Sequence, residues 1–217
     1  MDVVVMQYLD EAFFMFVTLI ALINPISAAA VFAALTEGRS DKEQAEIARR
    51  ASIVAGVALI VFAFVGEALL GVLGVKIGAF KIGGGLLLLK VGFNMVFAPA
   101  AHREMANCEP NAVPPSDPSV FPLAIPIITG PGALTASVAL VNPTTAHNYS
   151  NGVIFFIVAL LVIGITYLFM LGAEKLTARV GQTGIDAVSR IIGIIIAAIA
   201  VELVVDGISS LTHFTMS

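Results

Sequence analysis

The sequence predicts an all-α membrane protein whose six transmembrane helices form two halves of three helices each. Three observations lead to this prediction. Of the 217 residues, 59% are hydrophobic and 12% are charged, and the mean hydropathy of +1.00 lies well above that of soluble globular proteins. Apolar runs of about 20 residues or more recur along the chain, and this length crosses a hydrocarbon core of about 30 Å. Two of these runs contain a proline near the middle, at Asn24-Pro25 and at Gly130-Pro131.

The chain divides into spans and connections by composition. The predicted spans are residues 12–36, 51–75, 77–99, 119–141, 153–173 and 187–208. The predicted connections are a charged connector at 37–50, a polar linker at 100–117, a run of turn formers at 142–152, and a short loop that contains Lys175 and Arg179. The linker separates a first three-helix half, residues 1–99, from a second half, residues 118–217.

Basic residues in the connections predict the orientation of the spans. The first, third and fifth connections carry Arg39, Lys42, Arg49, Arg50, Arg103, Lys175 and Arg179, whereas the second carries Lys76 and the fourth and both termini carry none. Basic connections stay on the cytoplasmic side. We therefore expect a cytoplasmic-membrane protein with both termini outside and the linker, with the single Cys108, in the cytoplasm.

The two prolines are expected to break their spans, because proline lacks a backbone N–H and clashes with the preceding turn. Asn24 is a good N-cap and Pro25 a good first helical residue, so a half-helix begins there, and Gly130-Pro131 begins another. By helical rise, both breaks lie about 15 Å from the side at which the chain enters the membrane, near the midplane. Three spans are an odd number, so the second half enters from the opposite side. This predicts an inverted three-plus-three repeat.

Helix N-termini at the midplane favour a transporter site. Each presents unpaired N–H groups and about half a positive charge, which suits a carboxylate. Freed carbonyls before the breaks, with the side chains of Asn24 and Thr129, suit an ammonium group, and the small neighbouring residues favour a small neutral substrate. The alternative is that the breaks only kink packed helices. The predicted substrate-binding residues are Asn24, Pro25, Ile26, Ser27, Ala28, Thr129, Gly130, Pro131, Gly132 and Ala133.

Several motifs carry a resemblance to a known family. They are Asn24-Pro25 with Leu35-Thr36, Phe80-Lys81-Ile82-Gly83-Gly84-Gly85, the run from Phe121-Pro122 to Pro131-Gly132-Ala133, Arg190-Ile191-Ile192-Gly193, and Gly207-Ile208. With these motifs, nearly the whole chain resembles the MarC family of integral membrane proteins, which includes small-neutral-amino-acid transporters. The resemblance implies six spans and uptake of glycine, alanine and serine, coupled to an ion gradient, with the proton as the expected ion.

Polar groups inside the spans are candidates for coupling or for the pathway, because charge in a membrane is costly. Glu67 and Glu202 lie about 9 Å from the outer ends of their spans and are candidate proton carriers. Lys90 lies too deep to snorkel, and Asn94 is in the same span. Interfacial water is the alternative environment for the two glutamates and for Asp206, whereas Lys81 is expected to snorkel. Sodium, bound by Ser27, Thr129 and freed carbonyls, is the alternative coupling ion.

Other classes of function are less favoured. The three histidines lie outside the spans, and no acidic pair is placed to form an aspartyl dyad or a metal cluster. A phosphate-binding Gly-Lys-Ser/Thr motif is missing, so we expect no enzyme, no metal and no cofactor. A net charge of -4 with scattered basic residues gives no reason to expect a nucleic-acid partner. An exporter of small metabolites or drugs remains the nearest alternative, followed by a channel. The expected partners are the amino acid and membrane lipid, and no oligomeric state follows from the sequence.

Overall fold

The structure is a computed structural model that describes residues 2–97, 117–141 and 148–215, which are helical apart from short connections. Its elements are α1 (Asp2–Ile23), α2 (Pro25–Leu35), α3 (Asp41–Val72), α4 (Ile77–Phe97), η1 (Ser119–Ile128), α6 (Pro131–Val141), α7 (Asn148–Leu171) and α8 (Ala173–Thr215). Five helices in these ranges are long and apolar enough to cross a membrane, or six if η1 and α6, bent by 61°, form one span. The predicted helical membrane architecture is confirmed. Nearly all of the predicted 100–117 linker, Cys108, and residues 142–147 of the predicted turn lie outside the described residues.

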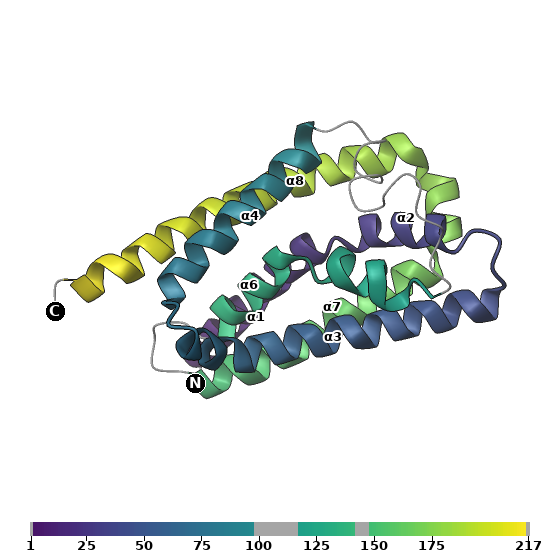
Figure 1. The fold of residues 1–217 in the computed structure, drawn as a ribbon. Coiled ribbons are helices and arrows are strands. Elements are labelled where there is room, and N and C mark those ends of the chain that lie inside the picture. Colours follow the sequence, from purple (N-terminus) through teal and green to yellow (C-terminus); the bar gives the residue numbers. More distant parts are fainter. Residues whose placement is uncertain (1, 98–116, 142–147, 216–217) are drawn as a thin grey trace.

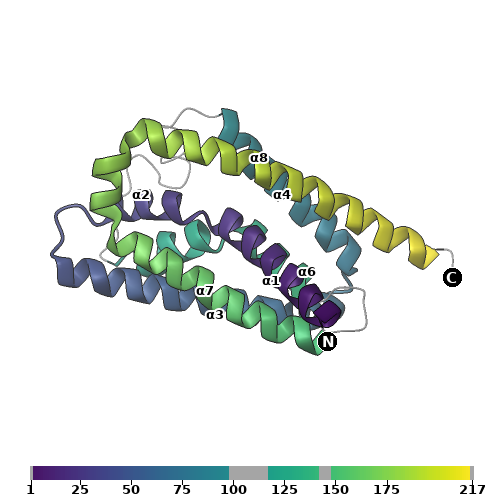
Figure 2. The ribbon, with the colours of Figure 1, turned by 180° about the vertical axis from the view of Figure 1, so that it is seen from behind.

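The two broken spans, α1 with α2 and η1 with α6, run through the middle of the molecule (Figure 1). On one side they pack against α3 and α7, and on the other against the antiparallel pair of α4 and α8, an arrangement that the view from behind repeats (Figure 2). The main apolar core lies among the broken spans, α3 and α7. A smaller core of Ala21, Leu88, Ile196 and Ala200 joins α4 and α8 to α1.

The start of α3 corrects the predicted connector between the first two spans. The helix begins at Asp41, inside the stretch predicted as a charged connector. Ser40 is its N-cap and forms a capping box with Glu43: the Ser40 hydroxyl accepts the Glu43 N–H, and the Glu43 carboxylate accepts the Ser40 N–H. This pairing satisfies two of the unpaired donors at a helix start, and it lets a polar segment continue as helix beyond the apolar run.

The start of α8 corrects a second boundary. Lys175 and Arg179 lie in a helical segment at the beginning of α8, not in a loop, and the direction changes at Gly181, whose φ of 65° and ψ of 168° are not helical. Ala, Leu, Lys, Glu and Arg dominate residues 173–179, and all five are good helix formers. Hydropathy alone locates the apolar part of α8 and misses this polar start.

The first half of the fourth span is not a regular α-helix. It is the π-type element η1, in which Phe121 and Ile125 have extended backbone angles and precede Pro122 and Pro126 through cis peptide bonds. The helix that follows, α6, begins at Pro131 as predicted.

Glycine brings α4 and α8 into backbone contact. The small residues Gly78, Gly85 and Gly92, seven apart on α4, face Gly207, Ala200 and Gly193 of α8, also seven apart. A Cβ on the three α4 glycines would lie 2.8, 2.8 and 2.9 Å from the carbonyl oxygens of these partners. Small residues allow this close approach, which is how membrane helices associate without a hydrophobic driving force between them.

The outer surface of the helices is apolar and suits contact with lipid. Large exposed apolar side chains occur along the outer faces of the spans, among them Val57, Val61, Phe64, Leu86, Leu87, Phe156, Leu160, Ile191 and Ile194. A soluble protein would cover a surface of this kind.

Candidate functional site: the two helix breaks

The first break is held open by Asn24, the residue between α1 and α2. Its φ of 47° and ψ of 75° are left-handed, and the residue is 5% exposed. The Asn24 Oδ1 accepts the Ser27 N–H at 3.3 Å and the Nδ2 donates to the Ser27 Oγ at 2.7 Å. Since Pro25 has no N–H, the Ala21 carbonyl loses its helical donor. The predicted N-cap and the predicted start of the half-helix are confirmed.

Ser189, on α8, joins this cap and was not predicted from the sequence. Its hydroxyl is 3.3 Å from the Ser27 hydroxyl, and Ser189 is 3% exposed. The hydrogen bonds therefore run from Asn24 through Ser27 to a helix of the second half. The signal for this residue was weak: a polar side chain at the start of an apolar run, 162 positions from its partner.

A cavity of about 210 Å³ opens beside the first break. Asn24, Pro25 and Ile26 form part of its wall. The other lining residues come from α1, α7 and α8: Val17, Ile20, Ala21, Ile165, Phe169, Ile192 and Ile195. The cavity is thus apolar except at Asn24, and it is smaller than the roughly 300–1,000 Å³ of sites that hold drug-sized ligands.

The second break is more tightly packed. Thr129 turns back onto η1, since both its N–H and its hydroxyl donate to the Ala124 carbonyl, at 2.9 and 2.8 Å. Gly132, in the first turn of α6, lies under Leu88 of α4, and a Cβ added to Gly132 would be 2.0 Å from the Leu88 Cδ2. Neither Thr129 nor Gly132 lines the cavity at the first break. A larger residue at position 132 would therefore disturb packing before it tested binding.

The two breaks lie at a similar level of the bundle. α1 packs against α6, and α2 packs against η1. From the breaks, α2 and α6 run toward opposite ends of the molecule, so their N-termini both lie in its interior (Figures 1 and 2). The geometry places partial positive charge from two helix N-termini in the middle of an apolar bundle.

Comparison with known proteins assigns the family. Residues 9–212 match the family described as "MarC family integral membrane protein". The chain belongs to the MarC family. A UPF0056 membrane protein of Methanocaldococcus jannaschii is 36% identical over 89% of this chain and 93% of that protein. A UPF0056 membrane protein of Archaeoglobus fulgidus is 33% identical over 93% of this chain and 94% of that protein. The UPF0056 membrane protein YvbG of Bacillus subtilis is 29% identical over 90% of this chain and 93% of that protein. No solved structure matches the chain. The predicted resemblance is confirmed, and the protein is an integral membrane protein.

This MarC-family protein contains an ion pair between spans that was not predicted from the sequence. Lys81 of α4 does not snorkel: it is 3% exposed, and its Nζ donates to the Asp206 Oδ2 of α8 at 2.6 Å. The Asp206 side chain is 53% exposed. The sequence does hold a signal for this pair, because Lys81 and Asp206 have opposite charges and similar predicted depths in two different spans.

The other polar residues predicted inside the spans lie on outer faces. Glu67, Lys90, Asn94 and Glu202 are all exposed, and none lines the cavity at the first break or the cavity at the start of α3. Their roles in coupling or in the pathway stay predictions. Lys90 is exposed, whereas Leu88 and Leu89 pack in or against the smaller core, so Lys90 lies on the side of α4 that faces away from this core.

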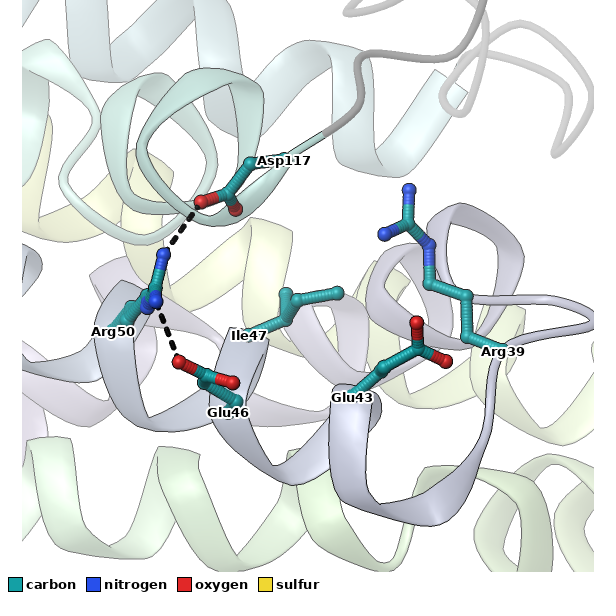
Figure 3. Close-up of a pocket in the computed structure, with 6 residues that line it drawn as sticks. All are labelled: Arg39, Glu43, Glu46, Ile47, Arg50 and Asp117. Atoms are coloured by element: carbon teal, nitrogen blue, oxygen red, sulfur yellow. Dashed lines mark hydrogen bonds and ion pairs between the residues drawn. The ribbon is translucent and has the colours of Figure 1, made fainter.

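A second cavity, of about 230 Å³, lies at the end of the MarC bundle where α3 begins. Figure 3 shows Arg50 between Asp117 and Glu46, with Arg39, Glu43 and Ile47 beside them. The Arg50 guanidinium donates to Asp117 at 3.1 Å and also pairs with Glu46. Asp117 also accepts the Ser119 N–H at 3.0 Å, and hydrogen bonds from Ser119, followed by Arg50, hold the pKa of its carboxyl below the ordinary value. This polar cluster ties α3 to the start of η1.

Proposed function

We propose that this MarC-family protein is a secondary active transporter of small neutral amino acids such as glycine, alanine and serine, working by alternating access across the cytoplasmic membrane. The observation that carries the proposal is the pair of broken spans, whose half-helices both begin inside the bundle and run to opposite ends. Discontinuous helices of this kind form the substrate sites of many secondary transporters. A proton is the proposed coupling ion, with sodium as the alternative.

The proposal includes an inverted three-plus-three repeat, and two features support it. Both half-helices are 11 residues long and both begin with proline, at Pro25 and Pro131. The last helices of the proposed halves, α4 and α8, pack against each other in antiparallel fashion, as a pseudo-twofold axis in the membrane plane would require. The basic residues of the connections favour both termini outside.

The proposed substrate site is centred on the first break. A substrate carboxylate would take the N-terminus of α2, and the ammonium would take freed carbonyls and the Asn24 side chain. In the state described here, the Asn24 Oδ1 already accepts the Ser27 N–H. An incoming carboxylate would replace that oxygen. The cavity of about 210 Å³ beside Asn24 suits a small substrate.

Filling this cavity tests the proposal. Ile192 lines the cavity, whereas its neighbour Ile191 is 61% exposed on the outer face. We expect Ile192→Phe to lower uptake of labelled glycine or alanine into proteoliposomes by about tenfold or more, chiefly through a higher KM, because the added ring occupies the space of the substrate. Ile191→Phe is the matched control and should transport like the parent protein.

Imposed gradients decide between the alternatives. A proton gradient or a sodium gradient that drives uptake identifies the coupling ion. If neither gradient moves glycine, alanine or serine, the substrate assignment fails and an exporter of small metabolites becomes the better interpretation. Equal uptake by the Ile192→Phe and Ile191→Phe proteins would instead remove the cavity from the substrate site.

A further inference from the structure

The ion pair of Lys81 and Asp206 differs from an interfacial anchor in its burial. The Lys81 side chain is 4% exposed and its Nζ is 2.6 Å from the Asp206 Oδ2. A buried ammonium group needs a compensating charge, and removing one partner of such a pair is strongly unfavourable. The Asp206 side chain is half-exposed and lies about 9 Å by helical rise from the end of its span at Thr212, within reach of the aqueous phase, whereas the ammonium is enclosed.

Among the side chains that the structure describes, the Lys81 ammonium and the Asp206 carboxylate form an ion pair only with each other. α2 and α6 carry no titratable residue. The titratable residues on α4, on α8 and on the other elements packed against them are Asp2, Tyr8, Asp10 and Glu11 of α1, Lys76 just before α4, Lys90 toward the end of α4, Tyr149 and Tyr167 of α7, and Glu174, Lys175, Arg179, Asp186, Arg190, Glu202 and His213 of α8. Glu202 is one helical turn from Asp206 on the same helix and is exposed, so it serves as a matched carboxylate for comparison.

Each helix of the pair also reaches one of the two breaks. On α4, Leu88 lies two turns, about 10 Å, beyond Lys81 and covers Gly132 at the second break. On α8, Ser189 hydrogen-bonds to Ser27 at the first break. A movement of α4 therefore changes the packing at the second break, and a movement of α8 changes the hydrogen bonds at the first.

We propose that the Lys81–Asp206 pair is the site at which the driving proton binds, and that α4 and α8 transmit its opening to the two helix breaks. This inference rests on the proposed transport function and deepens it. A proton from the aqueous phase bonds to a carboxylate oxygen of Asp206, which becomes a neutral acid. Lys81 keeps its positive charge and loses its partner, and α4 moves relative to α8 until that charge is solvated. Loss of the proton to water restores the carboxylate and the pair.

Neutralising Asp206 tests this in proteoliposomes. We expect Asp206→Asn to bring proton-driven uptake of labelled glycine down to the level seen without a gradient, about tenfold or more, while exchange of labelled for unlabelled glycine at equal pH continues. Glu202→Gln removes a carboxylate one turn away and should keep driven uptake. Uptake by the Asp206→Asn protein that still responds to the proton gradient would overturn the proposal.

A double variant separates coupling from a structural tether. Lys81→Met combined with Asp206→Asn leaves no unpaired charge, so the protein should fold and exchange substrate. If the pair binds the driving proton, this double variant still shows no response to a proton gradient. Full recovery of proton-driven uptake in it would overturn the inference, because the pair would then be only a tether.

A distance measurement tests the same inference without a substrate. Ala79 and Ile208 are exposed and lie beside the Gly78–Gly207 contact of the two helices. Spin labels are attached at Ala79→Cys and Ile208→Cys in a Cys108→Ser background. Acid should add a population with a longer distance between the labels. Asp206→Asn should show this longer distance at every pH, whereas Glu202→Gln should respond to acid like the parent protein. A distance that depends neither on pH nor on Asp206→Asn refutes the proton site. Acid-dependent opening without amino-acid uptake refutes only the substrate assignment.

Discussion

Single residues at the two breaks differ in how much room surrounds them. At the first break, Asn24 borders a cavity and supplies its own hydrogen bonds to Ser27. At the second, Gly132 is covered by Leu88. Leu88 of α4 therefore fills the space that a side chain at position 132 would occupy, and the cavity is confined to the first break. The Asn-Pro break borders a cavity, whereas the Gly-Pro-Gly break is closely packed.

Adding one methyl group at Gly132 should destabilise the fold. We expect Gly132→Ala to lower the free energy of unfolding by about 1–3 kcal/mol, because its Cβ would overlap Leu88. Leu88→Ala alone should cost about 2–5 kcal/mol through the cavity it leaves. Combined, the two changes should cost less than their sum, since each relieves the other. Unfolding of the purified protein in mixed micelles measures this, and strictly additive losses would contradict the described contact.

At the level of elements, the contact between α4 and α8 depends on particular glycines. Gly92 faces the backbone of Gly193 and Ala197, which cannot move aside as a flexible side chain would. Gly83, on the same helix, has open space where a Cβ would lie. Both positions are glycines of α4, but only Gly92 faces the backbone of another helix.

The pair gives a matched prediction. Gly92→Ala should destabilise the protein by about 1–3 kcal/mol through overpacking. Gly83→Ala should be neutral or stabilising by up to about 1 kcal/mol, because alanine is the better helix former. Thermal unfolding of both variants in detergent checks the contrast. Similar effects of the two changes would mean that helix propensity, not the interhelical contact, decides.

Elements were predictable where local chemistry sets them. The apolar runs and the proline breaks at Pro25 and Pro131 follow from hydropathy and from the missing proline N–H, so spans and half-helix starts were anticipated. The polar starts of α3 and α8 were missed because hydropathy does not detect a capping box or a charged helical turn. Lys81 with Asp206 and Ser27 with Ser189 are 125 and 162 residues apart, and only packing brings them together.

On the scale of the whole molecule, one ion pair between helices lies toward each end of the bundle in the described ranges, and each pair joins segments that are far apart in the sequence. Arg50 and Asp117 connect α3 to η1, whereas Lys81 and Asp206 connect α4 to α8. The two ends differ in exposure, because Arg50 and Asp117 are both about half-exposed. The Arg50 pair can therefore open into water at lower cost than the buried Lys81 pair.

Removing the exposed pair should loosen one end only. In a Cys108→Ser background, Ile47→Cys places a thiol in the wall of the cavity beside Arg50. We expect Asp117→Asn to raise its rate of modification by a charged thiol reagent by up to about fivefold, the worth of a surface ion pair. Asp41→Asn removes a nearby charge on α3 and should have no effect. An unchanged rate in the Asp117→Asn protein would mean that the pair does not restrain this end.

The pH dependence of that loosening follows from Asp117. Its pKa is lowered in the folded protein, so the stabilisation is complete above the ordinary carboxyl value and is lost as the pH falls through the lowered one. The test is the ratio of two modification rates of the Ile47→Cys thiol, one measured with Asp117 present and one in the Asp117→Asn protein. This ratio should stay constant between about pH 5 and 8.

The seven-residue spacing of small residues on both α4 and α8 has a consequence for assembly. If α8 slipped by seven residues, Gly85 would face Gly207 and Gly92 would face Ala200, so the two surfaces would still fit. Shape alone thus permits more than one register. Lys81 and Asp206 meet only in the one described, since the slipped register separates them by about 10 Å. The charges therefore select the correct alignment of two helices that geometry leaves ambiguous.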